Sequence, residues 1–188
     1  MTHDELVVAI ATCKQCRLWQ YRTVAVPGEG PRTPRIALLA EAPGKEEDLV
    51  GRPMMGQAGQ ILDLVLKQVG LSRSEAFLTN TVRCRPPRNR LADFPEAPAA
   101  CQKWTQAELD LYAPPVVVLL GLSAARPVFG PTAKMGEIHG LLRQTGPEFV
   151  LGERLWTPTW HPAAALHSPD RRAQIIADMV ADIKRVLR

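Results

Sequence analysis

Four short apolar runs divide the chain of 188 residues, and stretches with helical periodicity lie between them. The segment 57–69 has apolar residues three and four positions apart and stops at Gly70, which is typical of an amphipathic helix. The apolar runs, read as strands, are 35–40, 76–82, 115–120 and 155–160. Further helices are predicted at 3–12, 98–112, about 121–129 and 169–187, and a hairpin within 138–151.

This alternation of strands and helices is typical of an α/β sandwich with a mainly parallel sheet. We therefore expect one domain over residues 1–188, built on a central, mainly parallel four-stranded sheet. Ligands of such sheets bind beyond the carboxyl ends of the strands. Loops 41–56, 80–90 and 161–168 each follow a predicted strand, so we expect them to converge on one crevice.

Composition and charge narrow the class of protein. The chain is 46% hydrophobic and 22% charged, as in ordinary globular proteins. Its net charge of +4 permits a polyanionic partner without requiring one. Arginines cluster locally, at Arg83, Arg85, Arg88 and Arg90. Because no run of 18 apolar residues and no signal-peptide pattern is present, we expect no membrane segment and a cytoplasmic location.

Four cysteines, Cys13, Cys16, Cys84 and Cys101, form a second constraint. The first two make a C-x2-C pair, which places two thiolates on one side of a single centre. A disulfide is a weak interpretation in a cytosolic chain. Zinc and an iron–sulfur cluster both suit four thiolates, and the residues alone do not choose between them. Four unrelated buried cysteines are the remaining alternative.

Three motifs resemble those of the family 4 uracil-DNA glycosylases of bacteria and archaea. They are AEAPGKEEDLVGRPMMGQAGQILD at 40–63, TNTVRCRPPRNR at 79–90 and HPAAAL at 161–166, and they occur together with the four cysteines. The resemblance covers most of the chain, from Cys13 to the last helix. It implies an α/β/α sandwich and a [4Fe–4S] cluster on Cys13, Cys16, Cys84 and Cys101. It also implies hydrolysis of the N-glycosidic bond of deoxyuridine in DNA, which leaves an abasic site and an uncut strand.

An enzyme of this kind must extrude the base from the duplex, stabilise its departing charge and recognise its edge. His161 is the candidate donor to the negative charge that grows at uracil O2 as the bond breaks. Asn80 offers a donor and an acceptor together, which match O4 and N3–H of uracil and mismatch cytosine. The resemblance implies that Glu41 orients the uracil or the attacking water.

The loop after the first strand supplies further candidates. Ala42 stands where family 1 enzymes carry a water-activating aspartate, so we expect a dissociative reaction in which water captures a sugar cation late. Glu47 is a reserve group for positioning that water. Alternatively, residues 46–48 form a solvated acidic turn or a helix N-terminus. Backbone N–H groups from Ala42 to Gly44 are additional donors, because glycine allows close approach of the chain.

A separate set of residues is expected to contact DNA. Leu166 is the candidate wedge that enters the gap left by the flipped base. His167 and Arg171 are expected to hold phosphates. Arg85 and Arg88 are expected to line the DNA face or to support the cluster, and phosphate contacts would make binding salt-dependent.

The chain departs from the family pattern at three positions. Ala40 replaces a glycine, and Ala163 replaces a serine whose hydroxyl contacts phosphate. Met54 replaces the aromatic residue that stacks on uracil. A thioether also packs against an aromatic ring, so we expect stacking to survive with poorer geometry, and pocket tightness, rate and uracil selectivity to be affected.

The expected partner is uracil-containing DNA, single- or double-stranded, bound by a monomer. Two other functions stay open from the sequence. One is a catalytically weak or inactive DNA-binding module of the same fold, with the cluster as scaffold. The other is an electron carrier, which would leave Asn80, Glu41 and His161 without a role.

Overall fold

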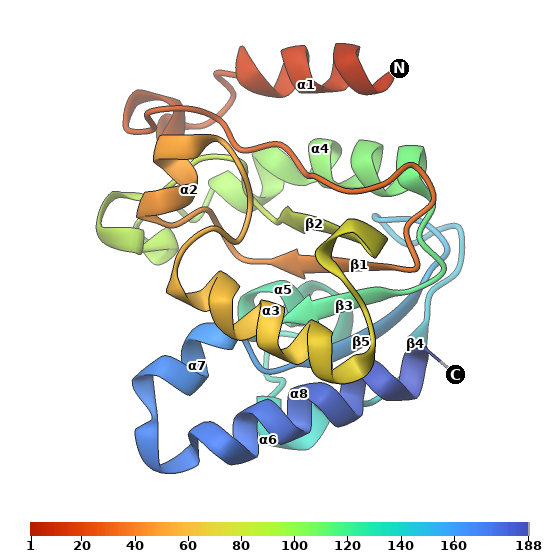
Figure 1. Cartoon of the computed structure of the whole chain (residues 1–188). Helices are drawn as coiled ribbons and strands as arrows, with labels where there is room; N and C mark the ends of the chain where they lie inside the picture. The colour runs from red at the N-terminus through yellow and green to blue at the C-terminus, as the bar shows by residue number, and fades with distance from the viewer. Residues whose placement is uncertain (188) are drawn as a thin grey trace.

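A five-stranded sheet lies between two layers of helices in the computed structural model, which describes residues 1–187 (Figure 1). The strand order is β2-β1-β3-β5-β4. Four strands are parallel, namely β1 (Ile36–Ala40), β2 (Ala76–Asn80), β3 (Val117–Leu120) and β5 (Leu155–Thr159), and the two-residue β4 (Arg143–Gln144) runs antiparallel to β5. The predicted α/β sandwich with a mainly parallel sheet is confirmed, and β4 adds a short fifth strand at one edge.

Burial on both faces explains why the parallel strands are continuous apolar runs. Every residue of β1, β2 and β3 is buried. Successive side chains point to opposite faces, so Ile36 and Leu38 enter one core while Ala37 and Leu39 enter the other. The pattern of each strand therefore defines two cores, one on each side of the sheet.

Three helices cover one face, namely α3 (Gln57–Val69), α7 (Pro162–His167) and α8 (Arg172–Val186). The predicted stripe of α3 is buried in this core, and the helix ends at Gly70, whose φ of +76° suits glycine. Figure 1 shows α3, α7 and α8 together on one side of the sheet.

The opposite face is covered by α4 (Ala97–Tyr112), α5 (Leu122–Phe129) and α6 (Met135–Ile138). Helix α1 (His3–Ala11) packs outside α4 and begins with a capping box between Thr2 and Glu5. The chain also contains single 3-10 turns, η1 (Arg17–Gln20), η2 (Arg73–Glu75), η3 (Pro87–Asn89), η4 (Leu91–Asp93) and η5 (Pro169–Arg171). Within residues 1–187, none of the helices combines the length and the apolar character that a membrane crossing requires.

Three local predictions were wrong. Helix α2 (Lys45–Val50) forms inside the expected loop 41–56, because Gly44 caps it and acidic residues fill its first turn. The expected loop 161–168 is mostly α7, with His161 as N-cap and Pro162 in its first turn. The hairpin does not lie within 138–151, because β4 pairs with β5 across the intervening loop.

The strand order reverses beside β1. From β1 the chain moves outward to β2, then returns to place β3 on the other side of β1. Because β1, β2, β3 and β5 are parallel, the segments that follow them emerge at the same edge of the sheet. This reversal is the position at which doubly wound sheets bind ligands.

Candidate active site

A cavity of about 590 Å³ lies at this carboxyl edge. Its walls come from all three segments that were expected to converge. They are Glu41 to Glu47, Met54 and Gly56 from the first segment, Asn80 and Asn89 from the second, and His161, Ala163 and His167 from the third. Gln57 and Ala58, at the start of α3, complete the lining. Glu41, Asn80 and His161 thus meet around one space, although they are far apart in the chain.

One hydrogen bond of the His161 ring fixes its tautomer. Its Nδ1 accepts the backbone N–H of Ala163 at 3.1 Å, as the N-cap of α7. A neutral ring that accepts at Nδ1 carries its proton on Nε2, so the remaining ring N–H is a donor. Burial lowers the pKa of His161 to about 4, with His167 adding to the decrease and Glu47 opposing it. The ring is therefore neutral at pH 7 and can still donate.

Gly121 makes room for this histidine. It follows β3, has a φ of +87°, and donates its N–H to the Thr159 carbonyl at 2.9 Å. A Cβ at Gly121 would lie 2.9 Å from the Cβ of His161, closer than real Cβ contacts. Gly121 was not among the site residues predicted from the sequence, although its place directly after the predicted strand 115–120 was a usable signal.

Asn80 is the last residue of β2 and is 2% exposed. It pairs in register with Ala40, the last residue of β1. Asn80 borders the cavity. Within the described residues 1–187, its side-chain amide makes no hydrogen bond to another residue. An amide at the cavity wall without a protein partner can pair with a ligand or with water, so Asn80 is suited to read a polar edge.

Glu41 leaves β1 directly beside Asn80. Its carbonyl accepts the Thr81 hydroxyl at 2.6 Å and the Val82 N–H at 3.2 Å. These bonds hold the backbone of Glu41 at the cavity, which Glu41 lines. Ala42 and Gly44 line the same cavity, so the whole turn after β1 borders this space.

Glu47 and Asp48 lie buried at the N-terminus of α2, so the helix N-terminus alternative is confirmed and the solvated acidic turn is wrong. They lie in the first turn of α2, at 8% and 3% exposure. Glu47 Oε1 accepts the N–H groups of Met55 at 2.7 Å and Gly56 at 2.8 Å. Asp48 accepts the N–H and hydroxyl of Thr23. Both carboxylates therefore anchor neighbouring loops, and Glu47 also borders the cavity.

Met54 contributes to both the cavity and the core. It is 7% exposed and packs with the core on the α3 side of the sheet. Its φ of +56° lies in the left-handed region, which non-glycine residues rarely adopt. The residue that replaces the family's aromatic is thus positioned at the cavity by an unusual backbone conformation.

The predicted DNA contacts lie partly at the cavity and partly outside it. His167 lines the cavity. Leu166 is half-buried against the core within α7, so entering DNA would require its side chain to leave those contacts. Arg171 lies over the Trp160 ring at 5.2 Å. Arg85 donates to the Asn89 side chain at 2.9 Å, and Arg88 is 77% exposed.

All four cysteines line a second cavity. Cys13 and Cys16 follow α1, Cys84 follows β2, and Cys101 lies in α4. None of them forms a disulfide. Within residues 1–187, no three His, Cys, Asp or Glu side chains are arranged to hold a single metal ion.

The surroundings of the cysteines test whether a thiolate-bound group fits. Arg22 Nη1 donates to Cys84 Sγ at 3.0 Å, and Trp104 Nε1 donates to Cys13 Sγ at 3.3 Å. Burial raises the pKa of the Cys101 thiol to about 11. An N–H donor favours a sulfur that carries negative charge, and a bound metal keeps buried thiols deprotonated. The donor set therefore fits a metal–sulfur group.

A buried ion pair connects the two cavities. Arg83 is 1% exposed, so it does not belong to the surface arginine cluster. Its Nη2 lies 2.7 Å from Glu108 Oε2, and its Nη1 donates to the Asn80 carbonyl. Glu108 also accepts from Thr79 and Gly28. The pair ties the end of β2 to α4. The sequence signal for the role of Glu108 was its place among the buried positions of α4.

Comparisons with known proteins agree with this arrangement. The family described as the uracil DNA glycosylase superfamily matches residues 27–184. The type-4 uracil-DNA glycosylase of Sulfurisphaera tokodaii is 40% identical over 90% of this chain and 78% of its own. That of Pyrobaculum aerophilum is 37% identical over 95% of this chain and 92% of its own. The type-5 uracil-DNA glycosylase of Thermus thermophilus is 38% identical, but over only 59% of this chain.

The parallel sheet, the cavity at its carboxyl edge and the match over residues 27–184 define a protein of the uracil-DNA glycosylase superfamily. Relatives named type-4 match 90% and 95% of the chain. The chain belongs to the type-4 uracil-DNA glycosylase family.

Proposed function

We propose that this protein is a DNA repair enzyme that hydrolyses the N-glycosidic bond of deoxyuridine in DNA. It releases uracil, leaves an abasic site and does not cut the strand. The observation that carries the proposal is the placement of the Asn80 amide and the His161 ring at the same cavity. The family supports it, because its relatives are named as uracil-DNA glycosylases.

Recognition begins when the base leaves the duplex and enters the cavity, at a cost of a few kcal/mol for unstacking and unpairing. Asn80 then donates to uracil O4 and accepts from N3–H. Cytosine presents the opposite pattern, a donor at N4 and an acceptor at N3, which mismatches the amide in this orientation. Met54 packs its thioether against one face of the ring.

Bond cleavage needs a stabiliser for the leaving base. As the C1′–N1 bond breaks, its electron pair moves onto uracil and negative charge grows at O2, while C1′ becomes cationic. The Nε2–H of neutral His161 donates to O2. Such a donor acts more strongly on the transition state than on the ground state, because the charge develops there. Water then adds to C1′, and the proton that it loses neutralises the uracil anion, so the products are uracil and an abasic site with a hydroxyl at C1′.

Two carboxylates supply the environment for the cation and the water. Ala42 carries no carboxylate, so Glu41 is the acid assigned to orienting uracil or water. Glu47 Oε1 is already occupied by two backbone N–H groups. Its Oε2 lies beside Gly44, since a Cβ there would be 2.6 Å from this atom. Oε2 is therefore the atom of Glu47 that is assigned to hold water.

The DNA itself is held outside the cavity by the residues assigned to it from the sequence. Leu166 fills the space left by the base, and His167, Arg171, Arg85 and Arg88 contact phosphates. The protein acts on uracil-containing DNA as a monomer in the cytoplasm. The positive net charge of +4 supports binding to a polyanion.

Cys13, Cys16, Cys84 and Cys101 would hold a [4Fe–4S] cluster. When bound, the cluster would supply a structural link between the segment after α1, the segment after β2 and α4. The N–H donors at Cys84 and Cys13 support thiolate ligands. Visible charge-transfer absorption and iron analysis of the purified protein distinguish the cluster from zinc, which is colourless.

The test of the function is direct. The protein is incubated with an oligonucleotide that contains one uracil, then treated with alkali, with thymine- and cytosine-containing oligonucleotides as matched controls. Cleavage only after alkali, and only at uracil, is expected. Cleavage without alkali would contradict a monofunctional enzyme. Binding in a gel-shift assay without cleavage would instead identify a DNA-binding module.

A further inference from the structure

The conformation of Met54 requires an explanation beyond the contacts of its side chain. A buried, non-glycine residue with a φ of +56° is conformationally strained. Such strain persists only where the surroundings enforce it, and it concentrates at ligand-binding and active sites. The contacts that hold the Met54 backbone therefore indicate which residues shape this wall of the cavity.

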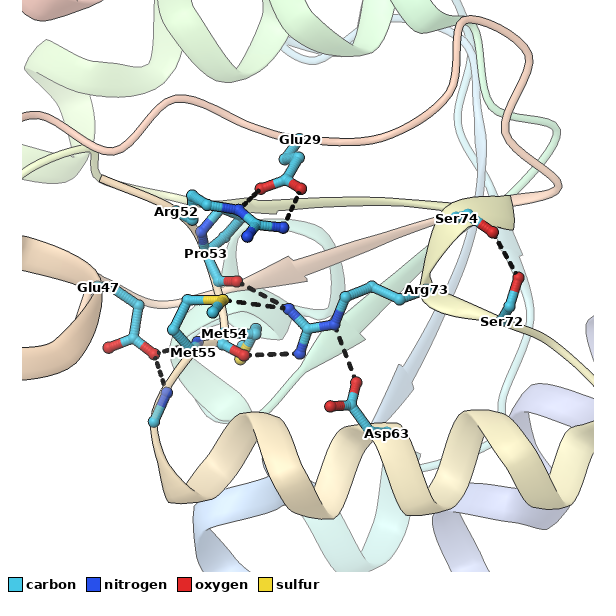
Figure 2. A network of polar contacts seen from close by, with 11 residues as sticks. Glu29, Glu47, Arg52, Pro53, Met54, Met55, Asp63, Ser72, Arg73 and Ser74 are labelled. Carbon is cyan, nitrogen blue, oxygen red and sulfur yellow. Dashed lines mark hydrogen bonds and ion pairs between the residues drawn. The ribbon is translucent and has the colours of Figure 1, made fainter. Parts of the chain in front are cut away.

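Arg73 forms hydrogen bonds to this backbone from outside the cavity. It lies in η2, after α3, and its guanidinium reaches back to the loop before that helix (Figure 2). Nη2 donates to the Met54 carbonyl at 2.6 Å, and Nη1 donates to the Pro53 carbonyl at 3.1 Å. Nε donates to Asp63 of α3 at 2.9 Å. One side chain thus connects two consecutive carbonyls to the body of α3.

Two further features hold the same loop. On the other side of the loop, Glu47 accepts the N–H groups that follow Met54, as Figure 2 also shows. At Gly59 a Cβ would lie 1.8 Å from the Met54 carbonyl oxygen, so only glycine permits this approach. The Met54 carbonyl is therefore enclosed by α3 and by Arg73, and its neighbouring N–H groups are held by Glu47.

We propose that Arg73 is a positioning residue for uracil binding. By holding the carbonyls of Pro53 and Met54, it keeps the Met54 side chain at the cavity and sets how tightly that wall meets the base. Arg73 does not touch the base. Its planar fork makes three directed bonds, which the single ammonium of lysine does not reproduce. This inference rests on the proposed function for the identity of the ligand.

Calorimetric binding of free uracil tests the proposal without requiring turnover. The variants Arg73→Gln and Arg73→Lys are compared with wild type and with Arg35→Gln. Arg35 is a matched control, because it is half-exposed and pairs with Glu75 near the same turn but does not contact the loop. Arg73→Gln is expected to weaken uracil binding on the order of tenfold, since small misplacements are costly. Arg73→Lys is expected to fall between, and Arg35→Gln to match wild type.

Affinity for undamaged DNA separates positioning from a merely structural role. It is expected to stay at the wild-type value in both Arg73 variants while uracil binding falls. Equal uracil affinity in Arg73→Gln and wild type would overturn the inference, and so would an equal loss of both affinities. If Arg73→Gln does not fold, Asp63→Ala removes the acceptor for Arg73 Nε on α3, and a smaller loss in the same direction is expected.

The outcome for the proposed function is read independently. A wild-type protein that binds uracil but leaves uracil-containing DNA intact would contradict the glycosylase activity, while the Arg73 comparison would stand. A wild-type protein that releases uracil, together with an unaffected Arg73→Gln variant, would contradict only the inference.

Discussion

The imidazole of His161 uses Nδ1 to cap α7 and is left with Nε2–H at the cavity. Replacement by alanine removes this donor. We expect His161→Ala to lower the single-turnover rate of uracil release by about 10²- to 10³-fold, the typical effect of losing one such donor. Folding and DNA affinity should stay near wild type. His3→Ala, on α1 and outside the cavity, is the control, and unchanged turnover in His161→Ala would refute the assigned role.

The lowered pKa of His161 predicts how its charge depends on pH. Its folded-state pKa of about 4 lies below the ordinary histidine pKa of 6.5. The unfolded chain therefore binds a proton at this residue before the folded protein does, and folding loses stability as pH falls through this window. We expect the ring, assigned in NMR spectra by comparison with His161→Gln, to stay neutral from about pH 8 to about pH 5. A midpoint near neutrality would contradict a buried neutral donor.

Met54 is expected to limit stacking on the base. A flat aromatic face offers better contact with uracil than a flexible thioether does. We therefore expect Met54→Phe to speed excision. Met55→Phe is the matched control, since its neighbouring side chain is 38% exposed. A slower Met54→Phe enzyme would mean that the cavity is shaped around methionine.

The junction of β3 and α5 tests how the strand ends position the site. Alanine at Gly121 would bring a Cβ within 2.9 Å of the His161 Cβ. Gly121→Ala should displace the histidine and slow uracil release on the order of tenfold to a hundredfold. Gly70→Ala is the control, because Gly70 also has a positive φ but open space around it. Equal activities of the two variants would show that backbone strain alone, not displacement, explains any loss.

Helices and strands differed in how well their sequences predicted them. The parallel strands could be predicted because burial on both faces favours continuous apolar runs. Helix α3 could be predicted because its buried stripe has helical periodicity. Helix α2 was foreseen only as one alternative, a helix N-terminus at 46–48, because its six residues are mostly charged. Its two buried carboxylates accept hydrogen bonds from Thr23, Met55 and Gly56, which lie outside the helix. Helix α7 was missed because proline and alanine also suit a turn.

Across the whole chain, the positions of Glu41, Asn80 and His161 followed from parallel topology, since strand ends meet at one edge. The residues that hold the site in place could not be predicted from this topology. Arg83 reads as one more arginine of a basic cluster, and Arg73 as a surface residue after a helix. Their roles depend on contacts with Glu108 and Met54 that no local pattern encodes.

A crystal structure of the protein soaked with free uracil would test the central claim most directly. We expect the base in the cavity at the carboxyl edge of the sheet, with the Asn80 amide at O4 and N3, and His161 Nε2 within hydrogen-bond distance of O2. Uracil bound elsewhere, or bound here with the imidazole turned away from O2, would contradict the account.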